Sequence, residues 1–211
     1  MSKFLNHDRA LCLSPHPDDV EYSMGGTIAK YSQTHFDIVC LSRGGDCDET
    51  TASERIDEAA AFWELNQCNN VAVKATGVRH VKDLAEDLWI NLLESNYVKV
   101  NDYDVIFTPS SSDSHFEHRI TNNLAPALSR LDRISIIEYC SPSTLEDWIP
   151  NLFVDIDDQF SQKLDSLQAF ASQQDRKYFT EATVRNFNSS FRCSKRGMVY
   201  VEQFRINQIY E

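Results

Sequence analysis

The chain has 211 residues, of which 42% are hydrophobic and 25% are charged, and these are ordinary values for a soluble globular protein. This length is enough for one domain with a substantial core and short for two, so we expect a single domain over residues 1–211. The net charge of −12 repels nucleic acid and anionic membranes. Neither is therefore expected as a partner.

No segment has the character of a leader or a membrane anchor. Residues 1–9 lack the apolar core of a signal peptide, and no apolar run approaches the roughly 20 residues that a membrane helix needs. A cytoplasmic location is the resulting expectation. The six cysteines show neither metal-site nor disulfide-framework spacing and are expected to be reduced. They are Cys12, Cys40, Cys47, Cys68, Cys140 and Cys193.

Short apolar runs alternate with segments of helical periodicity along the whole chain. The apolar runs predict strands at residues 10–14, 37–41, 71–74, 104–108, 134–139, 152–156 and 197–206. The periodic segments predict helices at 23–33, 53–65, 83–96, 159–172 and after the fourth strand to about 129. This alternation predicts a single-domain, Rossmann-like three-layer α/β fold with a mostly parallel sheet.

The first polar cluster, Ser14-Pro-His-Pro-Asp-Asp19, stands where the first predicted strand ends. Open α/β folds place their active sites at this edge of the sheet. The adjacent carboxylates of Asp18 and Asp19 repel each other, and a bound cation would relieve that repulsion. A catalytic zinc takes three protein ligands and leaves one position open, and His16 and Asp19 can supply two of the three.

A second polar cluster, Asp113-Ser-His-Phe-Glu-His118, follows the fourth predicted strand. His115 and His118 would share one face if this segment is helical, so a third ligand is expected here. Taken alone, an Asp-Asp pair after a strand is also typical of a helix cap, and a His-x-x-His pair of a solvated surface. The two clusters complement each other as a ligand set, which favours a metal site.

Three further features leave alternatives open. Arg55 falls in the first turn of the helix predicted from Ser53, where a cation is unfavourable. This indicates a carboxylate partner such as Asp19 or a substrate, although a solvated arginine remains open. Gly25-Gly26 is read as a helix start facing the site or as a place of close packing. Trp148 is expected in the core rather than stacked on a sugar.

The residues resemble the LmbE-like, or PIG-L, family of zinc-dependent de-N-acetylases. Residues 15–19 together with 25–29 resemble the first motif of that family, and the second cluster resembles its His-x-Asp-His element. Arg55 with Glu58, residues 167–173 and residues 199–204 are similar to later family segments. The resemblance therefore covers nearly the whole chain, with the first motif as its most specific part.

The resemblance implies a role for each site residue. His16, Asp19 and His118 would bind Zn²⁺, or another divalent ion such as Fe²⁺. Asp18 would be the general base toward water, and His115 would stabilise the oxyanion and protonate the leaving amine. Arg55 would contact the substrate. The implied reaction removes the acetyl group from a small-molecule N-acetylated amino sugar of the N-acetylglucosamine type, and the resemblance allows a homo-oligomer.

Three residues depart from the family pattern: Val78, Glu117 and Phe170. Glu117 stands where the family more often has aspartate, and we expect its longer side chain to influence His115. Val78 and Phe170 replace residues that are often aspartate and histidine. We expect these departures to bear on the substrate more than on the chemistry.

Two other functions are weighed against this one. His16, Asp18 and His118 also fit the two-histidine-one-carboxylate site of a non-haem iron oxygenase, but those enzymes usually have an all-β fold. A non-catalytic Rossmann-like binding module would use the acidic cluster only as a cap. The presence of both acid–base groups, Asp18 and His115, disfavours that alternative.

Overall fold

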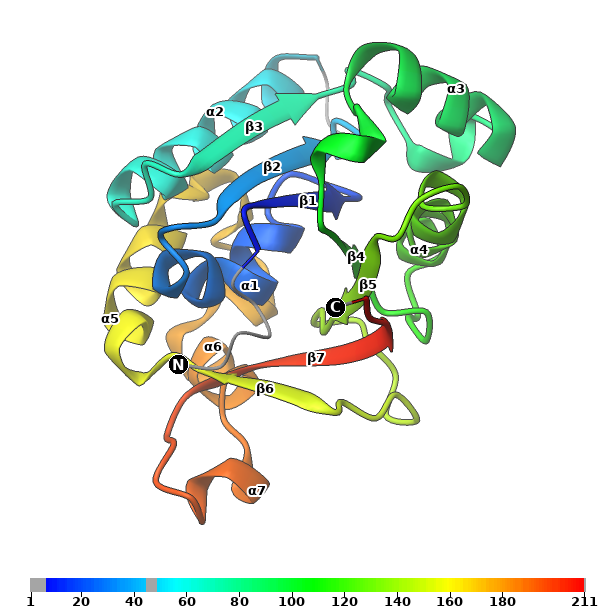
Figure 1. The fold of residues 1–211 in the computed structure, drawn as a ribbon. Coiled ribbons are helices and arrows are strands. Elements are labelled where there is room, and N and C mark those ends of the chain that lie inside the picture. The colour runs from blue at the N-terminus through cyan, green and yellow to red at the C-terminus, as the bar shows by residue number, and fades with distance from the viewer. Residues whose placement is uncertain (1–6, 45–48, 211) are drawn as a thin grey trace.

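A seven-stranded sheet forms the centre of the computed structural model, which describes residues 7–44 and 49–210 (Figure 1). The strands are β1 (Arg9–Ser14), β2 (His35–Cys40), β3 (Val71–Ala75), β4 (Val105–Pro109), β5 (Ser135–Tyr139), β6 (Leu152–Asp155) and β7 (Val201–Gln208). Their order across the sheet is β3-β2-β1-β4-β5-β7-β6. The first five are parallel, and β7 runs antiparallel to β5 and β6.

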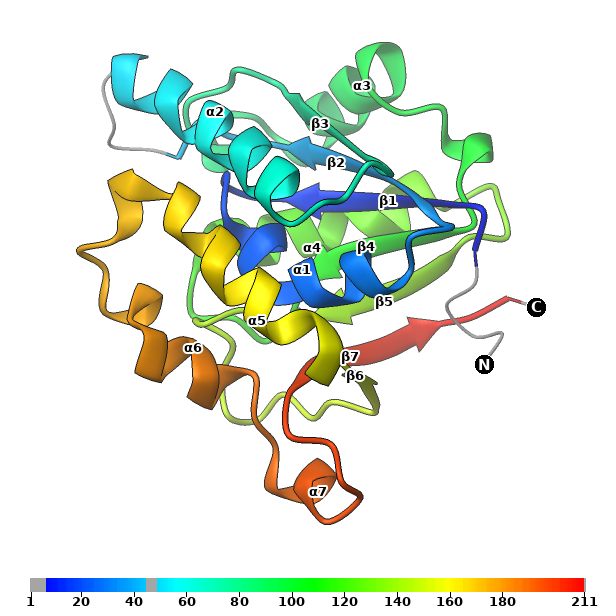
Figure 2. The same ribbon diagram turned by 90° about the vertical axis from the view of Figure 1, so that its left-hand side faces the viewer.

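Helices cover both faces of this sheet, which confirms the predicted α/β fold. The helices are α1 (Asp19–Lys30), α2 (Glu49–Leu65), α3 (Glu86–Asn96), α4 (Phe116–Leu128), α5 (Asp157–Ser166), α6 (Glu181–Phe187) and α7 (Phe191–Ser194). Helices α1, α2 and α5 lie together on one face, and α3 and α4 lie on the other (Figures 1 and 2). No helix of the described residues is long and apolar enough to cross a membrane.

Side-chain alternation along the central strands builds one core on each face. In β1, Ala10 and Cys12 pack into the core under α1 and α2, whereas Leu11 and Leu13 pack into the core under α3 and α4. All four are fully buried. A strand whose two faces are both covered must be apolar throughout, and this explains the continuous apolar run in the sequence.

The strand order changes direction between β1 and β4. From β1 the chain moves outward through β2 to β3 and then returns to place β4 on the other side of β1. The segments that leave the carboxyl ends of β1 and β4 therefore turn to opposite faces and leave a crevice between them. In open α/β sheets, ligands bind at such a point.

Helices α1 and α2 each begin four residues earlier than predicted. Helix α1 begins at Asp19, so Gly25 and Gly26 lie inside it rather than at its start. A Cβ at Gly25 would lie 2.8 Å from the Phe62 ring, and one at Gly26 would lie 2.9 Å from Ile156. These distances confirm the interpretation of close packing. Helix α2 begins at Glu49, so Arg55 is not in its first turn.

The other sequence expectations have mixed outcomes. Helix α5 ends at Ser166, and the chain continues in short 3₁₀ turns over 167–169 and 171–173 rather than one helix to 172.

Trp148 is buried, and its Nε1 donates to Glu138 Oε2 at 2.7 Å, so the prediction of a core tryptophan is confirmed. The cysteines of the described part are free thiols, and Cys47 lies outside it.

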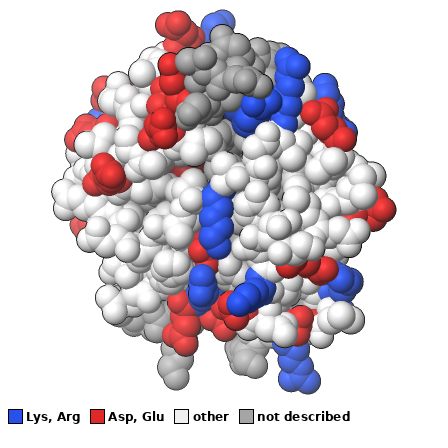
Figure 3. Space-filling model, turned by 90° about the horizontal axis from the view of Figure 1, so that it is seen from above, with Lys and Arg blue, Asp and Glu red and all other residues white. Residues whose placement is uncertain are grey.

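Surface charge is mixed despite the net charge of −12. On the face seen from above in Figure 3, Asp and Glu side chains lie in small groups interspersed with Lys and Arg side chains. This face therefore does not present one continuous acidic field.

A buried ion pair holds helix α1 where its backbone is interrupted. Met24 has φ −143°, so the helical hydrogen bonds break there. The freed N–H groups of Gly26 and Thr27 donate to the Glu202 carboxylate on β7, at 2.9 and 2.6 Å. Lys163 Nζ on α5 donates to Glu202 Oε1 at 2.7 Å, and both side chains are fully buried. Glu202 thus caps the second half of α1.

Removing one member of this pair should destabilise the fold strongly. We expect Lys163→Met to lower the free energy of unfolding by about 3–5 kcal/mol, because it leaves the Glu202 carboxylate buried without its cation. The double variant Lys163→Met/Glu202→Gln should recover part of that loss. Urea denaturation of the three proteins measures both effects, and a single variant as stable as wild type would contradict the assignment.

Candidate metal and catalytic site

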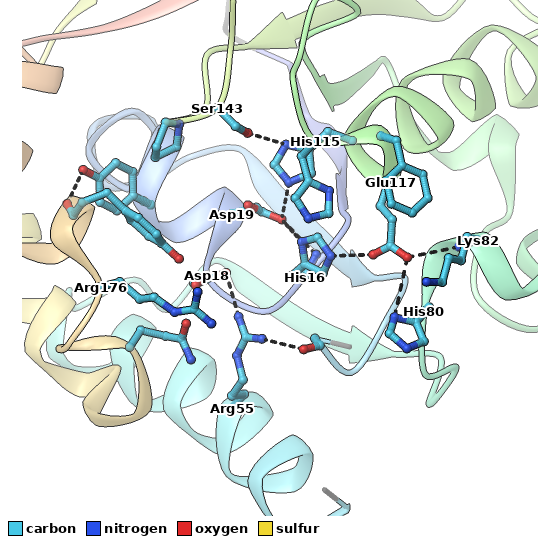
Figure 4. Close-up of a pocket in the computed structure, with 17 residues that line it drawn as sticks. His16, Asp18, Asp19, Arg55, His80, Lys82, His115, Glu117, Ser143 and Arg176 are labelled. Atoms are coloured by element: carbon cyan, nitrogen blue, oxygen red, sulfur yellow. Dashed lines mark hydrogen bonds and ion pairs between the residues drawn. The ribbon is translucent and has the colours of Figure 1, made fainter. Parts of the chain in front are cut away.

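Two loops from neighbouring strands meet over the point where the strand order reverses. The loop between β1 and α1 carries His16 and Asp18 and leads into Asp19 at the start of α1, and the loop after β4 carries His115 and leads into α4, which contains His118. All five line one pocket with a cavity volume of about 640 Å³ (Figure 4). The structure therefore brings together the two polar clusters that the sequence analysis singled out.

Three ligand atoms converge at the floor of this pocket. His16 Nδ1 lies 3.0 Å from Asp19 Oδ2, and His118 Nε2 lies 3.3 Å from the same oxygen. Donors bound to one tetrahedral zinc at 2.0–2.2 Å are about 3.3–3.6 Å apart. The arrangement of His16, Asp19 and His118 thus fits a divalent metal ion.

The remaining ring nitrogen of each histidine faces a second carboxylate. His16 Nε2 lies 2.8 Å from Glu117 Oε2, and His118 Nδ1 lies 3.0 Å from Asp113 Oδ2. Ser141 Oγ donates to the same Asp113 oxygen at 2.6 Å. A histidine that donates its far N–H to a carboxylate presents a lone pair on its other nitrogen, as metal-binding histidines do.

Glu117 and Asp113 make contacts that the sequence analysis did not predict. Glu117 hydrogen-bonds to His16, 101 residues away in the sequence, in addition to the expected influence on His115, whose pKa its charge acts to raise. Asp113 was within the second cluster and was given no role. Its position five residues before His118 was the available signal, because the turn into α4 brings the two side chains together. Neither Val78 nor Phe170 lines the pocket, and Phe170 is fully buried in the core.

Asp18 adopts a backbone conformation that is rare for a residue with a side chain. Its φ is 123° at the start of α1, and its N–H donates to Glu21 Oε2 at 3.2 Å. Glu21 is fully buried and accepts a hydrogen bond from Trp63 Nε1 at 2.8 Å. Strained backbone at a functional position persists only where its surroundings enforce it. Here the buried Glu21 is that support.

Arg55 is the partner of Asp18 rather than of Asp19, which the sequence analysis had named. Its Nη2 lies 3.1 Å from Asp18 Oδ1 and donates to the carbonyl of Pro17 at 2.9 Å. Burial raises the pKa of Asp18 to about 6, although the Arg55 charge acts to lower it. Arg55 on helix α2 therefore holds the Asp18 carboxylate in place.

His115 stands at the rim of the site. Its ring centroid lies 4.9 Å from that of His16 and 4.8 Å from that of His118, and its backbone N–H donates to Asp113 Oδ1 at 2.8 Å. Burial and the two neighbouring histidines hold the pKa of His115 below its usual 6.5. The ring is therefore mainly neutral at neutral pH and carries one N–H.

The opposite walls come from segments that the sequence analysis left without a role. Gln173, Arg176 and Tyr178 follow α5, and His80 and Lys82 precede α3. His80 is half-buried, with Nδ1 3.8 Å from Glu117 Oε1. These residues reach the pocket through tertiary packing, so no local sequence pattern marks them.

Metal-free protein should lose stability as the pH rises. Burial acts to lower the pKa values of His16 and His118, but the facing carboxylates raise them to about 9 and about 10. Burial also raises the pKa of Asp18 to about 6 and of Glu21 to about 7. All four groups hold protons more tightly in the folded state, so stability present at low pH is lost as the pH rises through these values.

We therefore expect the free energy of unfolding, measured with urea in a chelator, to fall between pH 6 and pH 9. The expected fall is at least about 1.4 kcal/mol, the equivalent of one pKa unit. His118→Gln should make the fall smaller. A stability that is constant or rises over this range would contradict the proton assignment.

Comparisons with known proteins identify the family of this chain. The PIG-L family model, described as GlcNAc-PI de-N-acetylase, matches residues 11–129, which is more than half of the chain. The diacetylchitobiose deacetylase of Thermococcus kodakarensis is 25% identical, and the alignment covers 78% of this chain and 70% of that protein.

Two solved structures show the same fold. N,N'-diacetylchitobiose deacetylase from Pyrococcus horikoshii, solved with its inhibitor MPG, has a TM-score of 0.77 at 24% identity and covers 96% of this chain and 85% of its own. GalB, the 4-carboxy-2-hydroxymuconate hydratase from Pseudomonas putida KT2440, has a TM-score of 0.74 at 19% identity and covers 97% and 98%.

The family match supports what the resemblance implied about class. It confirms the predicted family and the predicted type of enzyme, an N-deacetylase that hydrolyses amides. Both of the predicted motifs lie within the matched residues 11–129. The chain belongs to the PIG-L family of GlcNAc-PI de-N-acetylases.

Proposed function

We propose that this protein is a metal-dependent hydrolase that removes the acetyl group from an N-acetylated amino sugar. The observation that carries the proposal is the convergence of His16, Asp19 and His118 beside the Asp18 carboxylate, in one pocket of a PIG-L chain. The relatives named diacetylchitobiose deacetylase make N-acetylglucosamine conjugates the first substrates to test.

His16, Asp19 and His118 would hold the metal. Two imidazoles and one carboxylate are borderline donors that suit Zn²⁺, and they also accept Fe²⁺. A divalent ion in this place supplies Lewis acidity toward water and toward the acyl carbonyl. Glu117 and Asp113 fix the two rings in the orientation and tautomer that this binding needs.

Asp18 is assigned as the general base. Among the described residues, three carboxylates line the pocket: Asp18, Asp19 and Glu117. Only Asp18 has no contact at hydrogen-bond distance with His16 or His118, and its charged partner is Arg55. Arg55 holds its Oδ1, so the carboxylate keeps one orientation toward the pocket. It would take a proton from the attacking water. Arg55 also lines the pocket, so its expected contact with the substrate stays a prediction.

His115, from the loop after β4, is assigned as the proton donor. The neutral imidazole at the rim can donate a hydrogen bond to the developing oxyanion, and the protonated fraction of His115 can pass a proton to the leaving amine. Its position beside both His16 and His118 places it over the same small area of the pocket floor. Asp18 and His115 thus divide base and acid tasks between the two loops.

Two observations disfavour the alternative functions, an iron oxygenase and a non-catalytic binding module. The parallel α/β sheet differs from the all-β fold that an iron oxygenase would favour. A non-catalytic binding module would not need the Glu117 and Asp113 carboxylates that orient His16 and His118. The GalB structure shows that this fold also occurs in a hydratase, so the reaction itself needs a direct assay. The cytoplasmic location and the homo-oligomer stay predictions.

Metal content tests the donor set. We expect about one zinc per wild-type chain after purification without a metal-binding tag, and none in Asp19→Ala. Glu117→Gln should keep the site with an affinity about 10–100-fold lower, because it weakens the partner of His16. Asp87→Ala, which removes an exposed carboxylate of α3, is the matched control. Elemental analysis that finds no metal in wild type would contradict the proposal.

Asp18→Asn separates catalysis from metal binding. We expect this variant to keep its metal and to lose about 10²–10⁴-fold in turnover, the usual contribution of a proton-transfer group. The assay measures acetate released from diacetylchitobiose and from N-acetylglucosamine glycosides. Full activity in the variant would overturn the base assignment. Wild-type protein that releases no acetate from any N-acetylated sugar would overturn the proposed function.

A further inference from the structure

The turn over residues 80–83, which precedes α3, contacts the carboxylate that faces His16. Glu117 Oε2 lies 2.8 Å from His16 Nε2, and its other oxygen, Oε1, accepts the backbone N–H of Lys82 at 3.3 Å. His80 Nδ1 lies 3.8 Å from the same Oε1 (Figure 4). The two oxygens of one carboxylate therefore connect a residue of the metal donor set with a turn that lies between β3 and α3.

A buried tryptophan holds this turn from its far side. Val81 begins the short 3₁₀ helix of the turn and is fully buried, and its carbonyl accepts a hydrogen bond from Trp89 Nε1 at 2.7 Å. Trp89 lies on α3 and is fully buried in the core under α3 and α4. Within the turn, the Asp83 carboxylate accepts the N–H of His80 at 3.1 Å. The turn is therefore fixed both by its own hydrogen bonds and by the core.

The contacts of Trp89 and Glu117 with the turn involve one peptide group. Its C=O belongs to Val81 and accepts from Trp89, and its N–H belongs to Lys82 and donates to Glu117. A planar trans peptide directs these two bonds to opposite sides and rotates as a unit. The hydrogen bond from Trp89 to the carbonyl therefore fixes the direction of the N–H that reaches Glu117. Hydrogen bonds in such a chain also strengthen one another.

The length of the Glu117 side chain allows the double contact. Its carboxylate lies between the His16 ring on one side and the Lys82 N–H on the other. An aspartate has one methylene less, which withdraws the carboxylate by roughly 1.5 Å, the length of one C–C bond. At least one of the two contacts would then exceed hydrogen-bond distance. A glutamate at this position is therefore needed to connect the turn with His16.

We propose that Trp89 and the Val81–Lys82 peptide group position Glu117 and, through it, the His16 ring that would bind the metal. This inference rests on the proposed function, because it requires a metal ion at the donor set that includes His16. A ring held at Nε2 by Glu117 presents Nδ1 to the metal in one orientation. The turn before α3 thus contributes to metal affinity without supplying a ligand, and Trp89 is a positioning residue of the site.

The zinc affinity of the metal-free chain tests this connection. Competition with a coloured chelator measures the dissociation constant of Zn²⁺ for wild type, Glu117→Asp and Trp89→Phe. We expect Glu117→Asp to bind zinc about 10–100-fold more weakly, the usual effect of losing a contact behind a metal ligand. Trp89→Phe removes the indole N–H and keeps an aromatic ring. It should weaken zinc binding by about 2–10-fold, the equivalent of one hydrogen bond.

A double-mutant cycle separates positioning from a general loss of stability. If Trp89 acts through Glu117, adding Trp89→Phe to Glu117→Ala should not change the zinc affinity further. Leu128→Ala is the matched control, because it removes a buried side chain of the same core at the far end of α4. It should lower the melting temperature and leave the zinc affinity as in wild type. Additive effects of Trp89→Phe and Glu117→Ala, or an equal weakening by Leu128→Ala, would overturn the inference.

Amide hydrogen exchange tests the contact itself and needs no metal. We expect the Lys82 N–H to exchange about tenfold faster in Glu117→Ala than in wild type, as the loss of one hydrogen bond predicts, and at the wild-type rate in Leu128→Ala. Equal exchange in Glu117→Ala and wild type would overturn the inference. A wild-type chain that binds no zinc would contradict the proposed function. Zinc binding that is equally tight in wild type, Glu117→Asp and Trp89→Phe would overturn only the positioning role.

Discussion

A single carboxylate oxygen, Asp19 Oδ2, links the two loops on which the site depends. His16 approaches it from the same loop, and His118 approaches it from the first turn of α4. Two imidazoles directed at one carboxylate oxygen form a stable cluster only when protons or a cation lie between them. This shared requirement for positive charge is what makes the crevice between β1 and β4 a place for a metal ion.

Buried charge behind the site maintains this geometry. Glu21 supports the unusual backbone of Asp18, and Arg55 supports its side chain from α2. Farther along α1, the Lys163–Glu202 pair completes the hydrogen bonding where the helix is interrupted at Met24. The pairs Arg55–Asp18 and Lys163–Glu202 are buried, so loss of either member of a pair would leave an uncompensated charge in the core. The short first half of α1 is thereby held against the rest of the molecule.

The sequence predicted the mostly parallel sheet and the two polar clusters that line the pocket, because both leave local patterns. A strand covered on both faces must be apolar, and a polar cluster directly after it falls at the sheet edge. Contacts between distant segments leave no such pattern. The pairing of Glu117 with His16 and of Arg55 with Asp18 depends on how α4 and α2 pack, so no local sequence pattern indicated it. The start of α1 was misplaced because Gly25-Gly26 was given weight as a helix start, although close packing inside the helix requires those glycines.

The pocket divides into two parts with different structural origins. Its floor comes from the strand ends β1 and β4, whose positions are fixed by the sheet. Its outer wall comes from the segments before α3 and after α5, which carry Lys82 and Arg176. A change in the outer wall can alter the charge presented to a substrate without moving His16, Asp19 or His118. A deacetylase and a hydratase can share this fold for the same reason, because the sheet fixes where a ligand binds and the surrounding segments determine which ligand it is.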